Sequence, residues 1–155
     1  MAQEIERKFL LKSDAWRDQV SSAQRMSQGY LQRGADSAIR VRIAGDRAWL
    51  NIKKTLDGIH RLEYEYAIPL DDATEMLERV ALRPIIDKTR HLVRIGPHTW
   101  EIDEFHAENA GLVVAEIELD HADEAFDRPD WLGEEVSTDS RYFNSSLSEQ
   151  PYNSW

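Results

Sequence analysis

The chain has 155 residues, of which 41% are hydrophobic and 31% charged, as is typical of one water-soluble globular domain, here expected to span 1–155. Its formal net charge of −10 repels nucleic acid and anionic lipid, so we expect neither a nucleic-acid nor a membrane partner. Cysteine is absent, which excludes disulfides and thiolate chemistry and is compatible with the cytoplasmic location that we expect. We expect no signal peptide and no apolar stretch of the roughly 18 residues needed to cross a bilayer.

Most of the chain has the alternation of β-strands. Eight segments are predicted as strands, at 3–11, 27–33, 37–44, 47–54, 61–69, 85–95, 98–105 and 112–120. Short turn signals such as Asp57-Gly58 and Gly96-Pro97 separate several of them. Many strands with short connections indicate an antiparallel sheet or barrel.

Helices are predicted between the strands. The segment 72–82 has apolar residues at the spacing of an amphipathic helix, with Asp72 and Glu75 as a start signal and Pro84 after its end. Weaker helical patterns cover 13–24, 121–127 and 138–147. The tail from Glu149 onward has no periodicity.

Each predicted strand has one apolar face and one face of ionisable side chains. Glu4, Glu6 and Lys8 share a face of the first strand, because side chains two apart point the same way. The same spacing returns in the pairs Arg40/Arg42, Asn51/Lys53, Glu63/Glu65, Lys88/Arg90, Glu101/Asp103 and Glu116/Glu118. A sheet with one face in water would explain any single strand. It does not explain so many same-sign pairs, because adjacent like charges cost energy unless opposite charge lies between them.

A closed barrel resolves the pattern, with the apolar faces outward under helices and the charged faces around an interior channel. Eight strands leave room inside for one small ligand. Burying that many charges without partners is prohibitively costly. A polyanion would complement the bases and hard divalent cations the acids, and Mg²⁺ in particular favours carboxylate and phosphate oxygens. The fold expected is therefore α+β and mainly β, a closed eight-stranded antiparallel tunnel barrel with helices packed outside and a metal-dependent polyphosphate site within.

The charged motifs also carry a resemblance. The run from Glu4 to Lys8 resembles the E-x-E-x-K signature of the CYTH domain, or triphosphate tunnel metalloenzyme, superfamily. Further motifs follow in the family's order: Gly29-Tyr30-Leu31, Arg40/Arg42, Lys53, Glu63/Glu65, Lys88-Thr89-Arg90, Asp103, Glu116/Glu118 and the segment 135–144. The resemblance covers nearly the whole chain, and it implies the same eight-stranded tunnel.

The resemblance also implies roles for individual residues. The metal ligands for Mg²⁺ or Mn²⁺ would be Glu4, Glu6, Asp103, Glu116 and Glu118. The triphosphate would be bound by Lys8, Arg40, Arg42, Lys53, Lys88 and Arg90, with Tyr30 near the tunnel mouth and Arg141 closing one end. The residues acting in catalysis would be Lys8, Lys88, Glu63 and Glu65.

Three activities occur in the family: hydrolysis of inorganic triphosphate, hydrolysis of thiamine triphosphate, and cyclisation of ATP. The cyclase branch carries a His-Phe pair before E-x-E-x-K, whereas only three residues precede Glu4 here. The short chain leaves little length for a thiamine or nucleoside pocket, so cleavage of the terminal phosphoanhydride of inorganic triphosphate is favoured. A non-catalytic module that binds polyphosphate or a nucleotide stays open, as does a purely structural ion-pair network. A homodimer is also left open.

Overall fold

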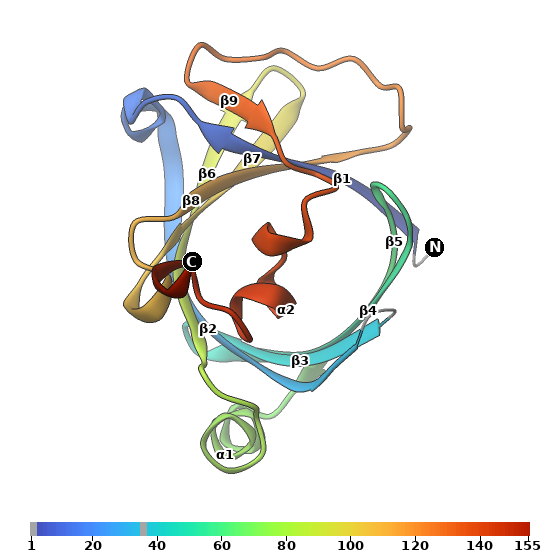
Figure 1. Ribbon diagram of the computed structural model, residues 1–155, viewed down its shortest axis with the longest axis vertical. Coiled ribbons are helices and arrows are strands. Elements are labelled where there is room, and N and C mark those ends of the chain that lie inside the picture. Colours follow the sequence, from blue (N-terminus) through green and yellow to red (C-terminus); the bar gives the residue numbers. More distant parts are fainter. Residues whose placement is uncertain (1–2, 35–36) are drawn as a thin grey trace.

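The computed structural model describes residues 3–34 and 37–155, in which the strands form one antiparallel sheet that closes on itself (Figure 1). The strands are β1 Gln3–Leu11, β2 Val20–Arg33, β3 Ser37–Ala44, β4 Arg47–Asp57, β5 His60–Ile68, β6 Ile86–Ile95, β7 His98–Phe105, β8 Val113–Leu119 and β9 Leu132–Glu135. Their order is β5-β4-β3-β2-β6-β7-β8-β1-β9, and a further pairing of β5 with β1 completes the ring. The eight-stranded antiparallel barrel is confirmed, with β9 added outside it along β1.

Two segments differ from the predicted elements near the start and end of the barrel. The predicted helix at 13–24 is only a short 3₁₀ helix, η1 Ala15–Gln19, after which β2 begins at Val20 and pairs with β6. Trp16 and Val20 are spaced as on a helix, but Trp16 is instead buried against the outside of the barrel. The predicted helix at 121–127 does not form, and Phe126 packs on that same cluster from an irregular loop.

The two α-helices lie on opposite sides of the barrel wall. α1 Leu70–Arg79 packs outside, as expected, with Ala73 and Leu77 against Val41 and Ala48. α2 Asn144–Leu147 lies inside the ring in Figure 1, which corrects the expectation that all helices pack outside. The remaining helical turns are η2 Ala107–Asn109, η3 Ser140–Tyr142 and η4 Tyr152–Ser154. In the described residues no helix is long and apolar enough to span a membrane.

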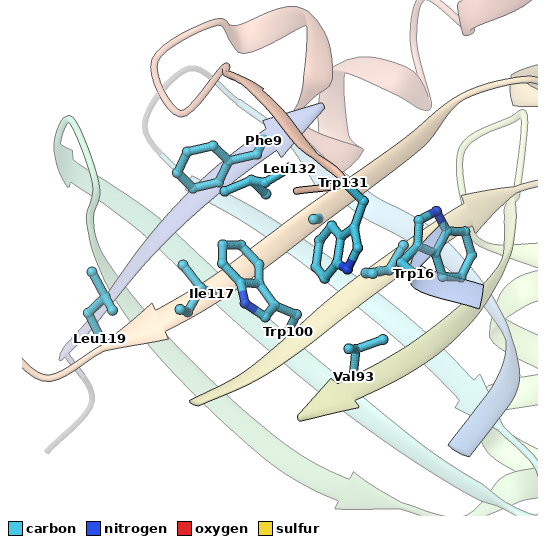
Figure 2. Close-up of a cluster of buried hydrophobic side chains, with 10 residues drawn as sticks. Phe9, Trp16, Val93, Trp100, Ile117, Leu119, Trp131 and Leu132 are labelled. Carbon is cyan, nitrogen blue, oxygen red and sulfur yellow. The ribbon is translucent and has the colours of Figure 1, made fainter. Parts of the chain in front are cut away.

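The largest hydrophobic cluster lies on the outer surface of the barrel rather than inside it. Figure 2 shows Phe9, Trp16, Trp100 and Trp131 packed there with aliphatic residues of β6, β8 and β9. The rings of Phe9 and Trp100 are 5.6 Å apart, and those of Trp100 and Trp131 are 5.8 Å apart, both edge to face. Such pairs add about 0.5–1.5 kcal/mol to the burial of their area. The outward core leaves the inner face of the strands free for polar groups.

One end of the barrel interior is apolar. Beyond their last charged residue, the inward-facing rows of β1, β6, β7 and β8 each continue with one apolar side chain. These side chains pack together at this end, and they are Leu10, Ile86, Phe105 and Val114. Tyr142 and Leu147 are buried among them. Both belong to the C-terminal segment, the residues 136–155 that follow β9. The C-terminal segment therefore fills this end of the barrel and carries α2 against the charged part of the interior.

Gly29 gives a test of how closely α1 and its connection approach the barrel. A Cβ atom at Gly29 would lie 2.7 Å from Ile85 Cδ1, 2.8 Å from Ala81 Cβ and 2.9 Å from Leu77 Cδ2. We expect Gly29→Ala to lower the free energy of unfolding by about 1–3 kcal/mol, because these packed atoms must move. Urea denaturation measures the change, with Ser27→Ala on the same strand as the control, for which we expect at most about 0.5 kcal/mol. Equal stability of the two variants would contradict this packing.

Candidate active site

The inner face of the barrel surrounds a cavity of about 870 Å³, to which all eight strands of the ring contribute side chains. Side chains alternate in and out along a strand, so the motifs with spacing two all reach this space. The predicted site residues that line it are Glu4, Glu6, Lys8, Tyr30, Arg40, Arg42, Lys53, Glu63, Glu65, Lys88, Arg90, Glu116 and Glu118. The structure thus brings together, on one cavity, residues that lie up to 114 positions apart, from Glu4 to Glu118.

Arg40 and Arg42 on β3 are cations that form no ion pair with a carboxylate in the part of the chain that the structure describes. Arg40 is buried, and its Nε has no hydrogen-bond partner. Arg42 Nε donates to the neutral Oε1 of Gln28 at 2.9 Å. Burial, together with the positive charges of Arg40 and Arg90, lowers the pKa of Arg42 to about 9. Within the described residues, the ion pairs of the cavity are made by other bases, so the acids Glu63 and Asp103 act on these two guanidinium groups only without direct pairing.

Lys88, Asp103 and Arg90 form a buried ionic cluster. Lys88 Nζ lies 2.8 Å from Asp103 Oδ2, and Arg90 donates to both oxygens of Asp103, at 2.9 and 3.0 Å. Burial, with Arg90 and Arg42 nearby, lowers the pKa of Lys88 to about 7, although Asp103 opposes the shift. Despite the burial of Asp103, the positive charges of Arg90 and Lys88 hold its pKa far below the usual range. Asp103 is fully buried, and both of its oxygens are already engaged.

Lys8 links β1 to β8 and to the C-terminal segment. Its Nζ lies 3.4 Å from Glu116 Oε1 and donates to the carbonyl oxygen of Tyr142 at 3.0 Å. It also lies 5.5 Å from the centre of the Phe143 ring. Burial raises the pKa of Glu116, but Lys8 and other bases outweigh it and bring that pKa down to about 2. Glu116 therefore stays ionised beside Lys8 at neutral pH.

Around Lys53 the charge balance is reversed. Its Nζ lies 3.0 Å from Glu4, 3.5 Å from Glu6 and 3.3 Å from Glu63, so one ammonium group faces three carboxylates. The pKa of Glu4 is raised to about 7. Burial is the main cause, and the charges of Glu6 and Glu63 add to the rise, whereas Lys53 opposes it. Glu4 Oε1 is buried and forms no well-directed hydrogen bond. The acids on this side exceed the bases available to them.

The same excess of acid extends to β8. Glu118 lies opposite Glu6 in the pairing of β8 with β1. Its pKa is raised by partial burial and by the charges of Glu101, Glu6 and Glu63. Within residues 3–34 and 37–155, however, no three acidic or histidine side chains converge closely enough to form a metal site as they stand. The donor chemistry suits a hard divalent cation, and such an ion would relieve the repulsion among these carboxylates.

Three of the predicted residues have surroundings that the sequence did not suggest. Arg141 is exposed outside the cavity, where it pairs with Asp139 at 2.7 Å and lies over the Trp155 ring. Tyr30 is buried and lines the cavity beside Arg40. Glu65 is on the rim, and its Oε2 accepts from Asn51 Nδ2 at 3.4 Å.

Sequence reasoning passed over four polar residues that line or support the cavity, namely Gln28, Arg33, Arg61 and Asn144. Gln28 and Arg61 lie two residues before Tyr30 and Glu63, so extending each inward row by one step would have found them. Arg61 is buried 5.2 Å from the Phe143 ring and donates to two backbone carbonyl oxygens. Nothing in the periodicity marks Asn144, because it enters the barrel from the C-terminal segment.

Comparison with known proteins agrees with this geometry. The CYTH domain model matches residues 2–152. The chain is 45% identical over 152 residues to an inorganic triphosphatase of Acetivibrio thermocellus, covering 98% of this chain and 97% of that protein. It is 34% identical over 149 residues to an inorganic triphosphatase of Nitrosomonas europaea, covering 94% of this chain and 96% of that one.

A solved structure shares the architecture as well. The crystal structure of an inorganic triphosphatase superposes with a TM-score of 0.69 at 32% identity, covering 96% of this chain and 95% of the other. The family model matches nearly the whole chain, and two relatives above 30% identity cover almost its full length. Sequence and structure thus point to the same family. The chain belongs to the CYTH domain family.

Proposed function

We propose that this protein is an inorganic triphosphatase, which uses Mg²⁺ or Mn²⁺ to hydrolyse the terminal phosphoanhydride bond of triphosphate inside the barrel. The observation that carries the proposal is the pair of guanidinium groups of Arg40 and Arg42, which face the cavity and pair with no carboxylate in 3–34 or 37–155. Guanidinium forks match phosphate oxygens in geometry and charge. The triphosphatase relatives, which cover nearly the whole chain, support the same substrate.

The residues that would hold the cation are Glu4, Glu6 and Glu118. Their carboxylates crowd one side of the cavity, where Glu4 Oε1 lacks a directed hydrogen bond and the pKa of Glu118 is raised by burial and its acidic neighbours. A bound divalent cation would neutralise phosphate oxygens and favour the ionised form of an attacking water. For Asp103 we propose a positioning role, since its oxygens hold Lys88 and Arg90, and for Glu116 the same role toward Lys8.

Hydrolysis requires a water oxygen to bond to the terminal phosphorus while the bond from that phosphorus to its bridging oxygen breaks, giving phosphate, diphosphate and one proton. The protein's part is mainly to position the chain of phosphates and to neutralise its charge. We assign that part to Arg40, Arg42, Arg90 and the lysines, with Lys88 and Lys8 nearest the C-terminal segment. Glu63 would orient Lys53, to which it is paired at 3.3 Å.

The surroundings of the cavity favour triphosphate itself over a triphosphate ester. Among its lining residues the aromatic side chains are Tyr30 and Phe143. The Phe143 ring already faces the cations of Lys8 and Arg61, at 5.5 and 5.2 Å. Trp16 and Trp100 are buried on the outside of the barrel, where they cannot stack on a thiazole, pyrimidine or purine ring in the cavity. A thiamine or nucleoside group therefore has no free aromatic platform among the described lining residues.

The first prediction concerns substrate and metal. We expect phosphate release from inorganic triphosphate with Mg²⁺ or Mn²⁺, loss of that release in EDTA, and much slower release from ATP and thiamine triphosphate. A colorimetric assay on the purified chain measures phosphate release from triphosphate with metal, from triphosphate in EDTA, from ATP and from thiamine triphosphate. Chromatography detects cyclic AMP. Release that persists in EDTA would refute the metal dependence. Preferential turnover of thiamine triphosphate, or cyclic AMP with diphosphate from ATP, would replace the proposed substrate, and binding without any turnover would indicate a binding module.

The second prediction concerns the unpaired guanidinium groups. We expect Arg40→Gln to raise KM for triphosphate about ten- to hundredfold, because a charge-assisted hydrogen bond contributes roughly 1.5–3 kcal/mol. Arg25→Gln is the matched control, since Arg25 is on the outer surface of the barrel and pairs with Asp87. Steady-state kinetics over a range of triphosphate concentrations measures both variants. A KM for Arg40→Gln equal to that of the control would remove Arg40 from the substrate site.

The third prediction concerns pH. A carboxylate must lose its proton to bind a cation, and the pKa of Glu4 in the free protein is about 7. Its ionised fraction rises about tenfold between pH 6 and pH 8, so the affinity for Mn²⁺ in the absence of substrate should rise by about the same factor. Isothermal titration calorimetry measures it. In Glu4→Gln the affinity should be lower and this part of the pH dependence lost. An affinity in the unaltered protein that is the same at both pH values would contradict the assignment.

A further inference from the structure

The C-terminal segment brings one polar side chain to the buried bases from inside the barrel. Asn144 is the first residue of α2 and lines the cavity. Leu147, three residues on, is fully buried in the apolar cluster at the end of the barrel. Ser148 accepts two hydrogen bonds from Arg33 of β2, at 2.7 and 3.0 Å. The position of Asn144 is therefore set by the packing on both sides of α2.

The carboxamide of Asn144 has its oxygen occupied by two donors. Asn144 Oδ1 accepts from Lys88 Nζ at 3.0 Å and from Gln28 Nε2 at 2.9 Å. Gln28 is itself fully buried, and its Oε1 accepts from Arg42 at 2.9 Å. A carbonyl oxygen has two lone pairs, so this arrangement uses both and fixes which way the amide points. The Nδ2 group must then point away from Lys88 and Gln28.

The Nδ2 group of Asn144 is left as a donor. It forms no hydrogen bond with any of the described residues, and it belongs to a side chain that lines the cavity. The same side chain faces the cavity next to Lys88, one of the bases assigned to the triphosphate. We propose that Asn144 is a further substrate-binding residue, whose Nδ2 donates a hydrogen bond to a phosphate oxygen of triphosphate while its Oδ1 holds Lys88 and Gln28 in place.

The proposal rests on the proposed function and explains why an amide is suited to this position. A carboxylate would satisfy Lys88 and Gln28 as acceptor but would repel phosphate. A basic side chain would attract phosphate but would repel Lys88 and would leave Gln28 Nε2 without an acceptor. Only a neutral group with both an acceptor and a donor serves the bases and the substrate together.

Asn144→Asp separates the two roles, because it keeps an oxygen for Lys88 and Gln28 but replaces the donor with negative charge. We expect it to bind triphosphate at least about tenfold more weakly than the unaltered protein, and more weakly than Asn144→Ala, which only deletes the amide. Binding is measured by calorimetry with sodium triphosphate in EDTA at pH 6. At this pH Lys88, with a pKa of about 7, is mostly protonated, so a rise in that pKa caused by the new carboxylate of Asn144→Asp hardly changes the charge of Lys88.

The control is Asn153→Asp, which makes the same change of charge on the exposed tail and should bind as the unaltered protein does. Thermal unfolding is recorded for each variant, and if Asn144→Ala does not fold, the comparison of Asn144→Asp with Asn153→Asp decides. Binding by Asn144→Asp equal to that of the control, or tighter than that of Asn144→Ala, would overturn the proposal. Absence of triphosphate binding to the unaltered protein would overturn it too. Binding with the expected order but without hydrolysis would leave it standing and refute only the triphosphatase.

Discussion

The arrangement of the barrel depends on one electrostatic constraint: charges removed from water must lie against opposite charges. Asp103 meets this fully, since two bases hold its oxygens at 2.8–3.0 Å in a buried position. From β7 it thereby fixes Lys88 and Arg90, which both lie on the adjacent strand β6. The constraint is not met everywhere, because Arg40 and Arg42 pair with no carboxylate of the described residues while Lys53 has three. The polar interior is thus divided into a surplus of positive charge and a surplus of negative charge, which a polyanion and a cation would balance.

The charge pattern was sufficient to predict the barrel, because the physics behind it is local. Alternation with period two assigns each strand an inner and an outer face, and same-sign pairs such as Arg40 and Arg42 make a flat solvated sheet a poor explanation. The inner rows of β1, β3 and β6 therefore followed from sequence alone, together with the idea of a phosphate and metal site. That site remains a prediction in its detailed roles, although the family is now established.

The parts that could not be predicted depend on contacts between distant segments. β9 has only four residues and forms by pairing with β1, so it carries no periodicity of its own. Arg141 and Asn144 are three residues apart, yet one pairs with Asp139 on the surface and the other reaches Lys88. What separates them is the burial of Tyr142 and Leu147 at the end of the barrel. No rule of local spacing gives that burial, because it depends on Ile86, Phe105 and Val114 from three strands.

The pairing of β1 has a consequence for how the protein is made. β1 lies between β8 and β5 in the ring, and Lys8 is opposite Glu116 across more than a hundred residues of chain. The barrel therefore cannot close during synthesis until β8 has left the ribosome, and the polar interior lacks α2 until Asn144–Leu147 follow. Folds dominated by such long-range pairing form slowly. Until then the nascent chain carries the charged rows of a binding site in open, solvated strands, and they are enclosed only when the ring closes and α2 enters it.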